Sequence, residues 1–170
     1  PEESRGKLTI PPGALTQDYL LYSSTSPASK PLRVSPAVIA DARTKLNQNV
    51  SPYTRPAQDK VWELYLQEED GRRASATFQK PGTLTLPYRD DNGDSILDGT
   101  TPPVRVKTLS LWWLDEDHSL WVRLPTSVVN VSSKTVTANV GHLSVFAVMG
   151  TPDNDPSAAY AFPVPWRPGG

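Results

Sequence analysis

The chain has 170 residues, which suits one domain with tails, and its 17 Lys and Arg residues nearly balance 18 Asp and Glu residues. A net charge of −1 gives no electrostatic reason to bind nucleic acid or an anionic membrane, and no apolar stretch is long enough to cross a bilayer. The absence of cysteine excludes disulfides and thiolate metal sites, while 18 prolines among β-branched apolar runs favour short strands joined by turns.

The first third of the chain predicts two strands followed by a helix. The strands are Lys7–Ile10, which ends at a Pro-Pro-Gly turn, and Asp18–Tyr22. Ser35 then occupies the N-cap position before Pro36, and we expect a helix from there through Asn47. Its apolar residues recur at helical spacing as Ile39, Ala42 and Leu46. Because this apolar face is narrow, we expect the helix to cover one edge of a sheet.

From Lys60 onward the apolar residues recur with period two, which predicts a series of short strands. The expected strands are the run from Lys60 to Leu66, then Ala76–Gln79, Thr83–Pro87, Val104–Leu114, Ser119–Leu124, Ser127–Val131, Thr135–Val140 and Leu143–Met149. This pattern is typical of an all-β fold, here an antiparallel β-sandwich with one short helix inserted after the second strand. We expect the domain to span residues 5–150, and residues 151–170 to be a linker or the start of a following domain.

The last predicted strand differs from the others because both of its faces are apolar. Val145, Ala147 and Met149 alternate along it with Phe146 and Val148. A strand with two apolar faces is typical of a position that is buried on both sides, so we expect it to be central in its sheet.

The segment from Leu109 to Met149 contains the most specific motif of the chain. Two tryptophans, Trp113 and Trp121, fall on neighbouring predicted strands. The segment ends with the string His142-Leu143-Ser144-Val145-Phe146, which leads into the apolar strand. Together with the opening string Leu8-Thr9-Ile10-Pro11-Pro12-Gly13-Ala14-Leu15, these residues resemble the GPCR autoproteolysis-inducing (GAIN) domain of adhesion receptors and its proteolysis-site motif. They are also similar to the related β-sandwich domain of netrin receptors and ankyrins.

The resemblance covers about residues 5–150 and implies an extracellular or cell-surface module that cuts its own backbone. By the resemblance the cut falls between Leu143 and Ser144, with Ser144 as the nucleophile and His142 as the base. The C-terminal strand would stay noncovalently bound after the cut. The other partners would be neighbouring domains of a larger chain, with no nucleic acid and no membrane segment in this sequence.

The chain departs from the receptor pattern in its lack of disulfides. The receptors clamp this region with two disulfides, and here Leu111 or one of its neighbours, and Val140, stand roughly where cysteines would be expected. The resemblance therefore implies a bacterial-type member of the family, which must hold its last strand by packing and by ladder hydrogen bonds.

The chemistry of such a cut also follows from the residues themselves. Ser144 Oγ can attack the carbonyl carbon of Leu143 in an N-to-O acyl shift, and water can then hydrolyse the resulting ester. An alcohol is a poor nucleophile near neutral pH, so it needs a base, and His142 can accept its proton. Gly141 is expected to supply the backbone freedom for a tight turn. Cleavage needs no cofactor, and each chain cuts once in cis, so no multiple-turnover enzyme is expected.

Two other functions remain open on the same residues. A His-Leu-Ser string is short, and a histidine beside an apolar strand is usually a hydrogen-bonded packing residue. The chain would then be an uncleaved structural or adhesion spacer of a multidomain surface protein. A weaker third reading is a carbohydrate-binding module that uses exposed tryptophans, although alternation places at least one of Trp112 and Trp113 in the core.

The segment 90–99 suggests a structural calcium site. Its hard oxygen ligands would stand at positions 1, 3, 5, 7 and 9 of an EF-hand-like loop, and they are Asp90, Asn92, Asp94, the Ile96 carbonyl and Asp98. The signature is incomplete, because Ser95 replaces the glycine of position 6 and Thr101 replaces the glutamate of position 12. The alternative is a polar hairpin loop with Asx turns.

Overall fold

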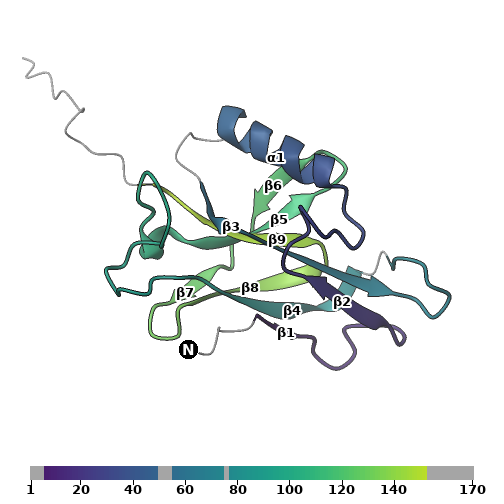
Figure 1. The fold of residues 1–170 in the computed structure, drawn as a ribbon. Helices are drawn as coiled ribbons and strands as arrows, with labels where there is room; N and C mark the ends of the chain where they lie inside the picture. The colour runs from purple at the N-terminus through teal and green to yellow at the C-terminus, as the bar shows by residue number, and fades with distance from the viewer. Residues whose placement is uncertain (1–5, 50–54, 75–76, 153–170) are drawn as a thin grey trace, which may run out of the picture.

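The computed structural model describes residues 6–49, 55–74 and 77–152, and these form two antiparallel sheets packed face to face (Figure 1). The strands are β1 (Lys7–Thr9), β2 (Leu20–Ser24), β3 (Arg55–Gln67), β4 (Thr77–Pro87), β5 (Ser110–Asp115), β6 (Leu120–Arg123), β7 (Val128–Asn130), β8 (Thr135–His142) and β9 (Val145–Gly150). One sheet has the order β1-β4-β8-β7 and the other has the order β2-β3-β9-β5-β6. The helix α1 (Pro36–Asn49) follows β2, so the predicted all-β sandwich with one inserted helix is confirmed.

Two predicted strands, Ala76–Gln79 and Thr83–Pro87, belong to a single strand, β4, while Ala76 itself lies outside the described residues. The pairing of β4 with β8 shifts register between Thr77 and Gly82, and Pro81 lies within this irregularity. Proline cannot donate to a ladder but is accepted at a bulge. The two predicted strands are therefore one strand that contains a bulge.

The predicted strand Val104–Leu114 is wrong in its first half. The structure places the short 3-10 helix η1 (Val106–Thr108) there, and β5 begins only at Ser110. The buried apolar residues of this segment are Val104, Val106, Leu109 and Leu111. In an extended chain every second residue faces the core, so one residue would separate two buried ones. Two residues separate Val106 from Leu109, and a turn is therefore needed to bury both. The 3-10 turn keeps all four apolar side chains inside.

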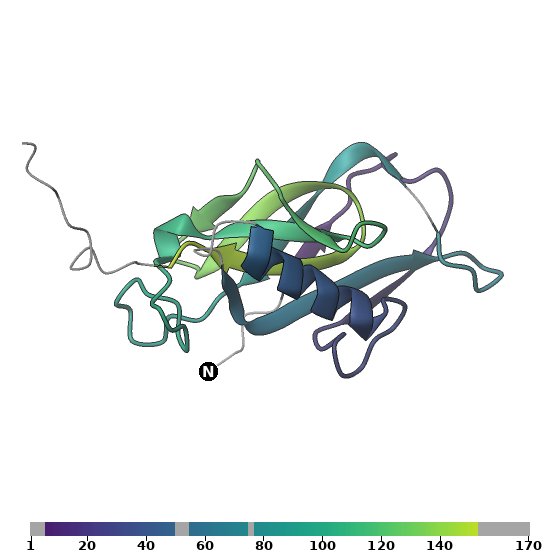
Figure 2. The same cartoon turned by 90° about the horizontal axis from the view of Figure 1, so that it is seen from above.

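The buried residues form two clusters, one on each face of the five-stranded sheet. The cluster between the sheets includes Leu84, Leu86, Leu111, Val136, Val140, Phe146 and Val148. The other lies under α1 and includes Ile39, Ala42, Leu46, Leu114, Trp121, Val145, Ala147 and Met149. The helix contacts the edge strand β6, as expected, but its buried residues also join residues of β5 and β9 (Figures 1 and 2). It therefore covers part of a sheet face and adds a third layer to the sandwich.

Strand β9 is central in the five-stranded sheet, as its two apolar faces predicted. It pairs with β3 on one side, where Phe146 lies opposite Trp62, and with β5 on the other, where Phe146 lies opposite Trp113. All six of its residues are buried. Because successive side chains point to opposite faces, alternate residues of this one strand fill the two clusters.

A buried carboxylate fixes the chain between β2 and α1. Glu63 on β3 is buried, and its carboxylate oxygens accept main-chain N–H groups from three successive residues. The donors are Leu32 at 2.7 Å, Arg33 at 2.6 Å and Val34 at 2.7 Å. A buried charge is tolerated when it is fully hydrogen-bonded. This arrangement holds the Ser/Pro-rich loop against β3 and orients the entry into the helix.

Replacing Phe146 with alanine should cost about 3–5 kcal/mol of unfolding free energy, because its side chain is 1% exposed and the surrounding core cannot close around the cavity. Val128→Ala is the control, since Val128 is 65% exposed on the edge strand β7 and should change stability by less than about 0.5 kcal/mol. Urea denaturation followed by tryptophan fluorescence measures both, with intact mass confirming that the chains compared are in the same covalent state. Equal losses in the two variants would contradict the central position of β9.

Candidate functional site

The candidate scissile bond lies where the chain crosses from one sheet to the other. His142 is the last residue of β8 in the four-stranded sheet, and Val145 is the first residue of β9 in the five-stranded sheet. Leu143 and Ser144 alone make the connection. The three predicted site residues therefore lie together at one end of the sandwich, immediately before its central strand.

Ser144 is anchored on both sides by main-chain groups. It is 4% exposed, its hydroxyl donates to the carbonyl oxygen of Leu114 at 2.8 Å, and its own carbonyl accepts the N–H of Leu64 at 2.9 Å. A buried hydroxyl needs such a partner, since an unpaired one would be costly. The hydroxyl proton is thus directed at β5 in this structure, and the bond to Leu114 must open before His142 can take that proton.

The imidazole of His142 packs edge-on against Trp113, with ring centroids 4.6 Å apart and an interplanar angle of 88°. Burial lowers the pKa of His142 below its ordinary value, and the positive charge of Arg73 lowers it further. The side chain is therefore neutral near neutral pH, which is the form that accepts a proton. The contact with Trp113 restrains the orientation of the His142 ring.

Arg73 and Glu116 form an ion pair beside the histidine that sequence reasoning missed. The guanidinium binds the carboxylate with two bonds, of 3.0 Å from Nη1 and 2.5 Å from Nη2. The two residues are 43 positions apart, so no local pattern in the sequence could join them. Only the packing of the turn after β3 against the turn after β5 brings them together.

A pocket of about 510 Å³ opens beside the Leu143–Ser144 bond. Its lining comes from the segment before β4 and the first residue of β4, from β5 with its following turn, and from the candidate site. The residues are Arg73, Ala74, Thr77, Trp113, Leu114, Asp115, Glu116, Asp117, His118, His142, Leu143 and Ser144. The pocket can admit water to the bond, as ester hydrolysis requires. His118 lies on its rim, largely exposed, with Nδ1 2.9 Å from Asp115 Oδ2.

The expectation for Gly141 is wrong. This residue lies inside β8, and it is not among the residues with positive φ. The reversal falls instead on Leu143 and Ser144. Gly82 pairs with Val140 and Thr77 with His142, so Gly141 lies within β8, opposite the bulge of β4, and does not form the turn.

The described tryptophans provide no flat exposed platform for a sugar. Trp121 is 8% exposed, while Trp112 and Trp113 are partly buried against opposite clusters. This places both residues of the Trp112–Trp113 pair partly inside, one on each face of β5. The carbohydrate-binding reading loses its main support.

The five residues predicted as calcium ligands lie in one loop after β4. Asn92 Oδ1 accepts the N–H of Asp94 at 3.2 Å, and Asp94 Oδ1 accepts the N–H of Ile96 at 2.8 Å, so the Asx turns of the alternative reading are present. Asp98 Oδ2 accepts the N–H of Asp91 at 2.9 Å. Within residues 6–49, 55–74 and 77–152, no three His, Cys, Asp or Glu side chains are gathered so that they could hold a metal ion.

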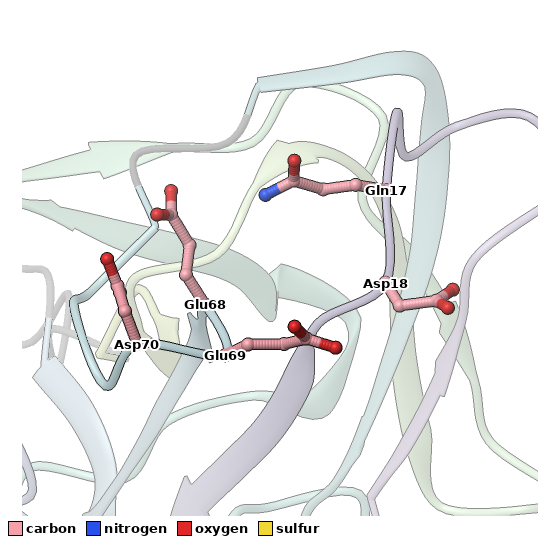
Figure 3. Close-up of a pocket in the computed structure, with 5 residues that line it drawn as sticks. All are labelled: Gln17, Asp18, Glu68, Glu69 and Asp70. Atoms are coloured by element: carbon pink, nitrogen blue, oxygen red, sulfur yellow. The ribbon is translucent and has the colours of Figure 1, made fainter.

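A second pocket, of about 390 Å³, is lined by acidic side chains far from the candidate site in sequence. Figure 3 shows its five residues, which come from the turn before β2 and from the turn after β3: Gln17, Asp18, Glu68, Glu69 and Asp70. Arg72 forms ion pairs with two of them, at 3.1 Å to Glu68 and 2.6 Å to Asp70. These carboxylates are partly neutralised from within the same turn.

Comparison with protein-family models, with curated proteins and with solved structures found no match for the chain. In the described part of the chain, no helix has the length and apolar character needed to span a membrane. The interpretation of the site therefore rests on its residues and their geometry.

The pKa of His142 should lie below the ordinary histidine value when measured by NMR titration of the Ser144→Ala variant, which keeps the chain intact. Arg73→Gln should raise this pKa, because it removes a nearby positive charge that opposes protonation. Arg72→Gln is the matched control, since Arg72 lies next in sequence but binds Glu68 and Asp70 instead. If both substitutions move the titration equally, the assigned role of Arg73 is wrong.

Proposed function

We propose that this chain is a cis-autoproteolytic module that cuts its own backbone between Leu143 and Ser144. The observation that carries the proposal is the position of Ser144, which follows a half-buried histidine of lowered pKa by two residues and precedes a fully buried central strand. The pocket beside the bond supplies access for water. The string His142-Leu143-Ser144 and its resemblance to the proteolysis-site motif agree with this chemistry.

The proposed reaction begins when the Ser144 hydroxyl leaves the Leu114 carbonyl. His142 accepts its proton, Oγ forms a bond to the carbonyl carbon of Leu143, and the carbon–nitrogen bond breaks. The imidazolium returns the proton to the amine of Ser144, which leaves an ester between the two residues. Water hydrolyses the ester to a Leu143 carboxylate and the free Ser144 hydroxyl. Tethering of the reactants gives a high effective concentration, so positioning is the main task of the fold.

The surroundings of the bond also suit the second half of the proposal, in which the cleaved strand stays bound. Residues 145–150 are all buried, and they pair with both β3 and β5. A cut between Leu143 and Ser144 would remove the covalent link to β8 but none of these ladder bonds. We propose that the two pieces remain one folded unit, in an extracellular or cell-surface protein in which neighbouring domains of the same chain are the partners.

A second candidate is an uncleaved structural or adhesion spacer. The bond from Ser144 Oγ to the Leu114 carbonyl favours it, because this bond gives the serine a structural task in the intact chain. In this reading His142 is a packing residue for Trp113. The two candidates differ in one measurable property, which is the covalent state of the Leu143–Ser144 bond.

Denatured protein should give two masses, for residues 1–143 and for the 27 residues 144–170, which follow from 170 − 143. The two pieces should elute together on native size exclusion. Ser144→Ala should leave one full-length mass because the nucleophile is gone, whereas Ser144→Thr should keep part of the activity. One full-length mass for the unaltered chain after long incubation at neutral pH would favour the spacer. A cut between Asp155 and Pro156 would indicate acid hydrolysis.

The rate of cleavage should rise with pH as His142 loses its proton, and it should level off above a pKa that burial and Arg73 hold below the ordinary value. His142→Ala should slow the cut by about 10²–10⁴-fold and remove this rising limb. His118→Ala is the matched control, since His118 lines the same pocket but is held by Asp115. Cleavage rates come from quenched time points separated on denaturing gels. An equal fall in cleavage rate in both variants would mean that His142 is not the base.

A further inference from the structure

The loop between β4 and Val104 contributes no residue to the pocket at the candidate cleavage site. Gly93 and Ser95 have φ values of 74° and 65°, so the chain turns twice through the left-handed region within three residues. Serine adopts this region at a cost, which hydrogen bonds around it must offset. The N–H of Ser95 donates to Asp90 Oδ2 at 3.2 Å, and its carbonyl accepts the N–H of Val106 at 2.9 Å. The turn at position 6 is thus formed without the usual glycine.

Asp90 provides a separate observation that points to a ligand. The residue is 2% exposed, and among the described residues its Oδ1 has no hydrogen-bond partner. Its other oxygen, Oδ2, is bound by the N–H of Ser95 in the middle of the loop, so the carboxylate faces into the loop. A buried carboxylate oxygen without a donor is costly, and a cation beside it would compensate this cost.

The remaining oxygens of the loop are of the kind that calcium prefers. The side chains of Asn92 and Asp94 are exposed and can turn toward a common centre at little cost, although Asn92 Nδ2 now donates to Asp94 Oδ2 at 2.8 Å. Calcium accepts six to eight oxygens in flexible arrangements, whereas magnesium demands a near-ideal octahedron. A loop whose ligands still have to gather suits the larger ion.

We infer that this loop binds one Ca²⁺ through Asp90 Oδ1, with the remaining ligands supplied by the side chains of Asn92, Asp94 and Asp98 and by the main-chain carbonyl of Ile96. The carboxylates of Asp94 and Asp98 draw together as the ion enters. The ammonium of Lys134, which donates to the Asp90 carbonyl oxygen, opposes the ion and keeps its affinity modest.

The ion would tighten a segment that covers the end of β9. Leu97 anchors the loop in the core at 1% exposure, and its N–H donates to the Val104 carbonyl at 2.8 Å. The side chain of Val104 packs directly on Gly150, since a Cβ there would lie 2.7 Å from Val104 Cγ1. Thr108 Oγ1 in turn accepts the N–H of Thr151 at 2.9 Å. Calcium in the loop therefore stabilises the place where the chain leaves the central strand.

The experiment is a calorimetric titration of the full chain, freed of metal by chelation, with CaCl₂, together with melting curves in Ca²⁺ and in chelator. The unaltered chain should bind one ion with a Kd on the order of 10⁻⁴–10⁻³ M and melt at a higher temperature with Ca²⁺. Asp94→Asn keeps the acceptor for the Ile96 N–H but removes a ligand charge, so binding should weaken at least about tenfold.

Asp91→Asn is the matched control, because Asp91 belongs to the same loop but pairs with Arg89 outside the ligand positions. Its Kd should stay within about twofold of the unaltered value, since the ligand set is unchanged. The inference is overturned if Ca²⁺ gives no heat and no change in melting, if Mg²⁺ raises the melting temperature as much as Ca²⁺, or if Asp91→Asn weakens binding as much as Asp94→Asn. Circular dichroism in chelator establishes that all three proteins are folded.

Discussion

The pairing of β9 with strands on both of its sides is the constraint on which the rest of this structure depends. Its alternate side chains belong to both hydrophobic clusters. Without β9, the core between the sheets and the core under α1 would each lose part of their buried residues. The sequence has no cysteine, and Leu111 and Val140 are both buried in the core between the sheets. Among the described residues, β9 is held by the burial of its apolar side chains and by its ladder hydrogen bonds to β3 and β5.

The Ser144 hydroxyl has a structural role in the intact chain and a chemical role in the proposed reaction. The bond from Ser144 to the Leu114 carbonyl helps to fix the connection between the sheets, and in the proposed reaction this bond must open before the hydroxyl can act. A typical buried hydrogen bond contributes about 1 kcal/mol net, while a buried donor left unpaired costs about 1–3 kcal/mol. Opening it therefore adds a modest step to any cleavage and no absolute barrier. The rate of the proposed reaction and the stability of the intact turn depend on the same atom pair.

Much of the fold was readable from the sequence because it rests on periodicity. The alternation in 145–149 predicted the buried central strand, and Ile39, Ala42 and Leu46 predicted the buried face of α1. The failures have physical causes. The bulge in β4 was predicted as a gap between two strands, because the residues that form it interrupt the pairing there. The 3-10 turn at 106–108 was missed because Val104 and Val106 alternate as they would in a strand. At the site, the His-Leu-Ser string was visible, but the Arg73–Glu116 pair and the Leu114 acceptor arise only from long-range packing.

Strand β1 begins and β9 ends at the same end of the sandwich. β8 runs from Thr135, near the start of β1, to His142, and β9 returns in the opposite direction after the crossing (Figure 1). Tension applied to the chain before Lys7 and after Gly150 would therefore peel β9 from its neighbours one ladder bond at a time, beginning at Gly150. It would not shear the whole strand along them, which needs all the bonds to break together. Val104 and Thr108 contact the chain at this starting point. The force needed to separate β9 from its neighbours would therefore depend more on these few contacts than on the burial of the whole strand.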